Sequence, residues 1–164
     1  MIERFRRWFD YEQDAHAKVL ASFDSVPLEH RSKEEFQQAL TLFAHLMAAR
    51  RLWLYRFGAY PEAPKEFFPK DVTLAQLHEQ LSHVNAIWAE HLSRLDDAQI
   101  VKTFEYRSLE GDFYRNVIED ILTQLFGHSW YHRGQIALLI RSLGGAPAVT
   151  DFVYWTREAI TTLR

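Results

Sequence analysis

The placement of helix-breaking residues is the feature of this sequence that most restricts its fold. The chain contains only six glycines and five prolines, and most of them fall in four short regions. These regions are Pro27, Gly58–Pro69, Gly111 and Gly144–Pro147. Because glycine and proline disfavour helices more than any other residue, the stretches between them are free to form long helices.

Those stretches carry apolar residues at the spacing of an α-helix. We expect helices over residues 3–24, 32–57, 73–97 and 116–143. The second is apolar on almost every side from Leu40 to Leu54, so it should be central. This pattern predicts an all-α protein, a four-helix bundle. A length of 164 residues suits one domain, residues 1–164.

Local signals predict where two of these helices begin. Ser32, followed three residues later by Glu35, predicts a capping box for the second helix. Asp71 or Thr73 is expected to cap the third helix. In both cases the side-chain oxygen would accept a hydrogen bond from the first helical turn.

Two short elements are expected beside the long helices. Asp151 is placed to cap a short C-terminal helix that runs through Thr161. Residues 101–107 alternate between apolar and polar side chains and lead toward Gly111. This alternation predicts a small β-hairpin between the third and fourth helices.

Charge and cysteine content exclude several kinds of protein. The net charge is −3, and no basic run of the kind that tracks nucleic-acid phosphates occurs, so we expect no nucleic-acid partner. The chain has no cysteine, which rules out disulfides and thiolate metal ligands. No apolar leader precedes residue 10, and no apolar stretch has the roughly 20 residues of a membrane span, so we expect no membrane partner. These features favour the cytoplasm.

The most informative stretch lies in the fourth helix and contains His128 and His132. Residues four apart lie one turn above each other on the same helix face, so the two imidazoles can converge on one metal ion. Both histidines continue the apolar stripe of this helix and should therefore point into the bundle. Buried imidazoles need partners, and a metal ion would satisfy both. The alternative interpretation is a pair of core or solvated histidines.

A third ligand has to come from another helix, and His45 is the best candidate. It lies in the middle of the most apolar helix, beside small alanines that leave room for an ion. On its own, such a histidine is more often a core residue bonded to a neighbour. The remaining histidines are poor candidates: His30 lies in a loop, and the spacing of His78, His83 and His91 is unsuitable for one ion. His16 lies near the inner face of the first helix, where it could support the site or line a pocket.

The sequence from His128 to Gln135, HSWYHRGQ, followed by LIRSLG and then Thr150-Asp151-Phe152, resembles the closing motif of the DinB/YfiT-like family. The segment from His45 to Arg56, with Trp53 eight residues after the histidine, is similar to that family's second-helix motif. The likeness extends over nearly the whole chain. One departure is Gln124, where members of the family often carry another histidine.

This resemblance implies a bundle with up-down-down-up order, which the roughly fifteen residues between the second and third helices permit. It also implies that His45, His128 and His132 bind a divalent metal, zinc as the first expectation and nickel as the second. Many members form homodimers, and we expect one here. The family includes S-transferases and isomerases that use low-molecular-weight thiols such as bacillithiol, mycothiol or glutathione.

The expected function is therefore a metal-dependent transferase that joins such a thiol to an electrophilic small molecule. Three imidazoles leave an open coordination position, where a metal lowers the pKa of a thiol or a water. The alternatives are a metal-dependent hydrolase and a non-catalytic metal-binding protein of the stress response.

No general base can be identified from the residues alone. Glu12, Asp14 and His16 lie along the first helix, where a solvated or ion-paired face is the simpler interpretation. Arg133 is expected to brace the bundle rather than to bind substrate. Four aromatic residues could line a pocket, although core packing is the commoner role; they are Trp53, Trp88, Trp130 and Tyr131.

Overall fold

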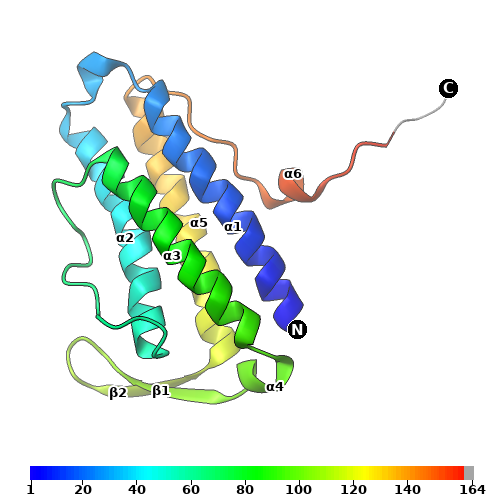
Figure 1. The fold of residues 1–164 in the computed structure, drawn as a ribbon. Coiled ribbons are helices and arrows are strands. Elements are labelled where there is room, and N and C mark those ends of the chain that lie inside the picture. The colour runs from blue at the N-terminus through cyan, green and yellow to red at the C-terminus, as the bar shows by residue number, and fades with distance from the viewer. Residues whose placement is uncertain (161–164) are drawn as a thin grey trace.

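The computed structural model describes residues 1–160 of the chain. Four long helices form the bundle: α1 (Ile2–Ser22), α2 (Glu34–Arg56), α3 (Leu74–Arg94) and α5 (Ile118–Ser142). In Figure 1, α1 and α5 run upward while α2 and α3 run downward, so the predicted up-down-down-up order is confirmed. The extended connection from α2 to α3 returns the chain to the upper end of the bundle and makes this order possible.

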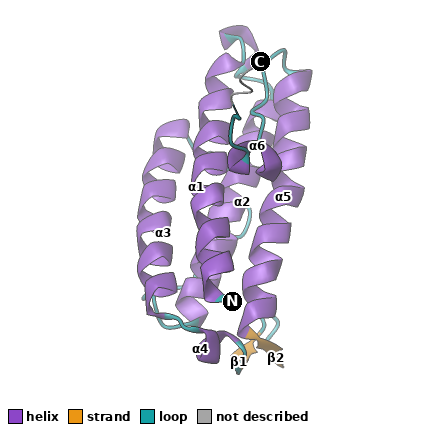
Figure 2. Ribbon diagram, turned by 90° about the vertical axis from the view of Figure 1, so that its right-hand side faces the viewer, coloured by secondary structure: helices purple, strands orange, loops and turns teal. Residues whose placement is uncertain are grey.

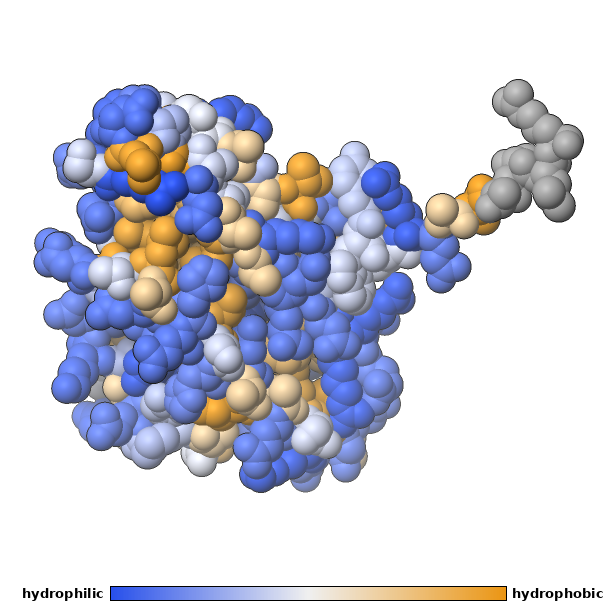
Figure 3. Space-filling model, turned by 45° about the horizontal axis from the view of Figure 1, so that its top comes forward, coloured by the Kyte–Doolittle hydropathy of each residue, from blue (hydrophilic) through white to orange (hydrophobic). Residues whose placement is uncertain are grey.

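Each long helix packs against two of the others. Both α1 and α2 pack against α3 and α5, so α1 and α2 lie diagonally opposite each other. Figure 2 shows α1 between α3 and α5, with α2 behind them. The shared interior is a continuous cluster of aliphatic and aromatic side chains, and buried residues occur on all sides of α2, as its composition predicts. Figure 3 shows that the face of the molecule turned toward the viewer is mostly hydrophilic, with smaller apolar areas.

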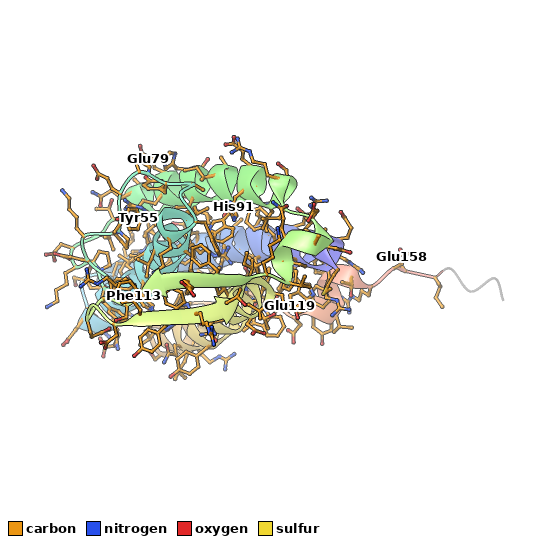
Figure 4. All side chains as sticks on the ribbon, turned by 90° about the horizontal axis from the view of Figure 1, so that it is seen from below. Tyr55, Glu79, His91, Phe113, Glu119 and Glu158 are labelled. Carbon is orange, nitrogen blue, oxygen red and sulfur yellow. The ribbon has the colours of Figure 1, made fainter. Side chains whose placement is uncertain are left out.

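The predicted hairpin is present. Strand β1 (Thr103–Arg107) pairs antiparallel with β2 (Phe113–Val117). Residue 116, the predicted start of the fourth helix, belongs to β2, so α5 begins two residues later, at Ile118. Figure 4 shows the hairpin crossing the lower end of the bundle. Phe104 and Tyr106 form its inner face, with ring centroids 4.8 Å from Phe57 and 4.9 Å from Trp53 respectively. The hairpin therefore closes the bundle beside the C-terminal end of α2.

Short helices occupy the remaining connections. The 3₁₀-helices η1 (Phe23–Ser25) and η2 (Leu28–His30) join α1 to α2, and α4 (Asp97–Ile100) precedes the hairpin. The segment after α5 crosses the face of α1 and α5 and includes α6 (Phe152–Thr156). Phe152 and Trp155 pack edge-on against Tyr11, with ring centroids 5.0 Å and 5.8 Å away.

The helix starts correct one prediction and confirm another. Ser32 is not the cap of α2, because that helix begins at Glu34 after Lys33, with no capping side chain. Thr73 does cap α3, and its hydroxyl and the side chain of Gln76 form a reciprocal capping box. Asp71 instead takes a left-handed conformation in the preceding turn, with φ of 57°.

The expected C-terminal helix is shorter than predicted. It ends at Thr156, Asp151 forms no side-chain cap, and no residue of α6 is buried. A helix of one turn without a cap or a buried face has little to stabilise further turns, so residues 157–160 are not helical. Thr161, the predicted end, lies outside the described residues. Within residues 1–160, no helix combines the length and the apolar character needed to cross a membrane.

Candidate metal centre

The structure brings His45, His128 and His132 together across the packed faces of α2 and α5. His45 lies midway along α2, and the i,i+4 spacing on α5 places the other two rings beside it, with the three rings edge-on to one another. The Nε2 atom of His128 lies 3.0 Å from Nε2 of His45 and 3.1 Å from Nε2 of His132. The three potential ligand atoms lie within 4.8 Å of one another. One ion can therefore contact all three imidazoles.

Hydrogen bonds on the opposite ring nitrogens orient two of these rings. Nδ1 of His45 donates to the carbonyl oxygen of Phe67 at 2.8 Å, and Nδ1 of His132 donates to Oε1 of Gln135 at 2.7 Å. A neutral imidazole carries one N–H, so this assignment leaves a lone pair on each Nε2. A carbonyl or carboxamide partner on the far nitrogen is the usual support of a metal-binding histidine.

The three Nε2 atoms cannot all satisfy one another. If His128 carries its proton on Nε2, it can donate to only one neighbour, and the Nε2 atom of the other neighbour accepts no hydrogen bond from it. If it carries the proton on Nδ1 instead, lone pairs face each other in both contacts, at 3.0 Å and 3.1 Å. A cation among the three nitrogens would remove this repulsion. The donor set therefore fits a metal ion, and imidazole nitrogens suit zinc, nickel, copper and iron.

Burial favours the neutral, metal-binding form of two of these rings, His45 and His128. Burial lowers the pKa of His45, although its bond to the Phe67 carbonyl acts in the opposite direction. Burial lowers the pKa of His128 to about 4, and the charges of His132, His45 and Arg50 add to the effect. Both imidazoles are thus unprotonated at neutral pH, which is the form that binds metals.

One side of the histidine group is covered and the other is open. The ring of Phe68, from the connection between α2 and α3, stacks on His45 with centroids 4.0 Å apart and planes 4° from parallel. His128 is only partly buried. Among residues 1–160, no other histidine and no carboxylate joins the group. A metal held here would keep a coordination position free for a small molecule.

Phe67 and Phe68 support the site, and sequence reasoning missed them. They lie in the connection between two helices, where no periodic pattern marks them. Tyr131 was a pocket candidate, and its ring centroid lies 5.0 Å from that of His132. The other three candidates lie elsewhere: Trp53 packs on the hairpin, Trp88 is buried in the core, and Trp130 is exposed on α5. Gln124 is exposed on α5.

A second polar group lies in the core beside the histidines, and we call it the buried ion cluster. It consists of Glu12, Arg50 and Arg133, each at most 4% exposed. The carboxylate of Glu12 pairs with the guanidinium of Arg50, and its Oε1 lies 3.7 Å from Nη1 of Arg133. Arg133 also donates to the Tyr11 hydroxyl at 2.6 Å, which in turn donates to the carbonyl of Thr150.

This cluster changes the interpretation of several predicted residues. Glu12 is held between two guanidinium groups inside the bundle, so it belongs to no solvated face and does not reach the histidine group as a base. Arg133 braces α1 against α5, as predicted. Asp14 forms the expected exposed ion pair, with Lys18 at 2.6 Å. Sequence reasoning missed Arg50, although it is a charged residue within the apolar stretch of the second helix.

His16 is buried one turn after Glu12, and neither of its ring nitrogens has a hydrogen-bond partner. Its ring lies edge-on to Phe43 with centroids 5.8 Å apart. Burial lowers the pKa of His16 to about 3, and the positive charge of Arg133 adds to this effect. The residue is therefore a neutral core histidine and not a ligand, as its sequence position suggested.

The buried state of His16 predicts that acid destabilises the protein. Below about pH 6.5 the unfolded chain protonates His16, while the folded chain stays unprotonated until about pH 3, so protons favour unfolding throughout this window. Between pH 7 and pH 5, we expect the parent to lose about 2 kcal/mol more free energy of unfolding than a His16→Leu variant. Urea unfolding at the two pH values measures this difference. The exposed His78→Leu variant is the control, and equal losses in parent and His16→Leu would contradict the prediction.

Comparison with known proteins agrees with the motifs of the sequence. The model of the DinB family matches residues 2–162, almost the whole chain. A search of the curated proteins and a search of the solved structures each found no match. The fold, the histidine group and the family match are thus all compatible with a metal-binding protein.

Proposed function

The chain belongs to the DinB family, and we propose that its three-histidine group holds a divalent metal ion at which a low-molecular-weight thiol is activated for transfer to an electrophilic small molecule. Zinc is our first expectation for the metal and nickel our second. The observation that carries the proposal is the convergence of three Nε2 lone pairs with no fourth protein ligand among the described residues. Structural zinc sites are usually closed by four protein ligands, whereas catalytic sites keep a position open.

Each of the chain's residues at the centre has a separate task. His45, His128 and His132 would hold the ion, and the Phe67 carbonyl and Gln135 fix the orientation of two of these rings. Phe68 stacks on His45 and shields that side from water. When bound, the metal would lower the pKa of a thiol at the open position, so that the thiolate is available at neutral pH. Since the chain has no cysteine, the thiol must be a separate substrate.

In the net reaction, the thiol sulfur forms a bond to an electrophilic carbon. The leaving group departs with the electrons of the broken bond, and the thiol proton passes to solvent. None of the described carboxylates or other histidines joins the histidine group, so the structure favours metal activation of the thiol over a dedicated protein base.

A non-catalytic role for the ion is the competing function. The three histidines connect α2 with α5, and an ion between them would also hold these helices together. However, the two helices already share an extensive apolar interface. Removing the ion should therefore leave the bundle folded if the centre is catalytic, and should lower its melting temperature strongly if the centre is structural.

A single set of measurements tests these possibilities. We expect zinc- or nickel-loaded protein to consume bacillithiol, mycothiol or glutathione in the presence of an alkylating electrophile, and mass spectrometry should detect the thioether. Chelated protein and the His45→Ala variant should be inactive while retaining the helical circular dichroism of the parent. Metal-dependent turnover of esters without a thiol would favour hydrolysis. Absence of any turnover, with a large fall in melting temperature on chelation, would favour the structural role.

Homodimer formation stays a prediction. Light scattering tests it, and a monomeric mass would contradict it.

A further inference from the structure

The buried ion cluster carries unequal charge. Two guanidinium groups, those of Arg50 and Arg133, face a single carboxylate, that of Glu12, and all three side chains are excluded from water. Among the described residues, these are the only aspartate, glutamate, lysine or arginine side chains that are buried. The cluster therefore places a net charge of about +1 in the interior, where low polarisability makes it act over longer distances than at the surface.

The acidic groups nearest the cluster do not cancel this charge. Asp14 and Asp151 influence the Tyr11 phenol, which touches Arg133. Asp14 is ion-paired with Lys18 at the surface, and Asp151 is exposed. Water screens both carboxylates, so the interior excess of positive charge persists.

The cluster lies directly behind the histidine group. On α5, Ser129 directly follows His128, and Arg133 directly follows His132. The side chains of Ser129 and Arg133 are both buried in the core. Nη2 of Arg50 lies 3.4 Å from the hydroxyl oxygen of Ser129. The positive charge of Arg50 therefore lies beside Ser129, the residue that directly follows His128 on α5, and its field reaches the histidine group. The same field acts on anything bound at the open side of the centre.

We propose that the buried ion cluster makes the open position of the three-histidine centre selective for anionic ligands. The ligand class that this geometry favours is a small monoanion, such as a thiolate, over a neutral donor such as an amine. The inference rests on the metal site of the proposed function and deepens it by assigning Arg50 as a positioning residue. Arg50 attracts the incoming anion through its charge, and Glu12 limits the size of that attraction.

This role differs measurably from a structural one. A positive charge behind the centre strengthens the binding of an anion but weakens the binding of the cation itself. Neutralising Arg50 should therefore move the two affinities in opposite directions. If Arg50 only held the helices in place, its replacement would loosen the centre and weaken both.

The test uses cobalt(II) as the metal and azide as the anionic probe, both followed by visible absorption. For Arg50→Gln, we expect azide to bind about tenfold more weakly and cobalt(II) to bind several-fold more tightly than in the parent. Glu12→Gln raises the net charge of the cluster and keeps a hydrogen-bond acceptor for Arg50, so it should strengthen azide binding. Arg51→Gln is the matched control, because the neighbouring Arg51 stacks on Tyr60 at 4.9 Å and should change neither affinity.

The outcomes separate this inference from the proposed function. If the parent binds no cobalt(II), the metal site is wrong and the inference fails with it. If the parent binds cobalt(II) and azide, but Arg50→Gln binds azide as the parent does or loses both affinities together, only the role of the cluster is overturned. Should Arg50→Gln prove unfolded by circular dichroism, an unchanged or weakened azide affinity in Glu12→Gln would overturn it instead.

Discussion

Replacing either His45 or His128 by alanine is expected to abolish metal binding. The parent, purified without a histidine tag, should contain about one zinc or nickel ion per chain. In each variant only two imidazoles remain, and the ion would lose one of the converging Nε2 atoms that lie 3.0 Å apart. We expect the affinity for the metal to fall more than about a hundredfold, because loss of a direct ligand should exceed the effect of losing a supporting residue. Elemental analysis and competition with a chelator measure this change.

The control for these variants is His78→Ala. His78 is an exposed histidine on α3 that takes no part in the histidine group, so its replacement should leave the metal content unchanged. Thermal unfolding of the alanine variants establishes that the bundle is intact. Full metal content in either His45→Ala or His128→Ala would refute the assigned ligands. If the parent protein is metal-free and takes up neither added zinc nor added nickel, the three residues are polar core histidines and not metal ligands.

Glu12→Ala is expected to destabilise the folded bundle strongly. It removes the only buried carboxylate among residues 1–160 and leaves Arg50 and Arg133 in the core without a counter-charge. Removing one partner of a buried ion pair typically costs about 3–5 kcal/mol, which is a large part of the stability of an ordinary domain. Urea denaturation at pH 7, followed by circular dichroism, gives the difference in the free energy of unfolding.

Asp14→Ala provides the matched comparison on the same helix. The Asp14–Lys18 pair has a distance of 2.6 Å, but both side chains are more than a third exposed, at 37% and 51%. Exposed pairs of this spacing are worth less than about 1 kcal/mol, so the variant should unfold almost like the parent. Similar unfolding free energies for Glu12→Ala and Asp14→Ala would show that the buried ion cluster does not stabilise the bundle.

The long helices could be predicted from the sequence because their signals are local. Apolar residues repeat at the helical period between clustered glycines and prolines, and the left-handed Gly144 with φ of 80° ends α5 where the pattern stops. The hairpin was visible through its alternation. The errors also have local causes, since Ser32 matched a capping pattern that the backbone does not use, and α6 lacks the buried face that would have extended it.

The candidate site was only partly predictable. His128 and His132 share a helix, so their spacing alone places them on one face. His45 is separated from them by more than 80 residues. Its place in the apolar second helix made it a candidate, and the resemblance to a known family supported the choice, but no local spacing could place it beside them. Nothing in the pattern around Phe67 and Phe68 indicated that a connecting segment would orient and cover one of the rings.

The sequence by itself therefore determined the four helices, the hairpin, the pair of histidines on α5 and the absence of any cysteine ligand. The tertiary structure alone decided that three Nε2 atoms meet, that one side of the group stays open, and that Glu12 is enclosed by Arg50 and Arg133. The physical reason is the range of the interactions. Helical period and capping act within a few residues, whereas burial and charge pairing depend on which faces of α1, α2 and α5 the packed bundle brings together.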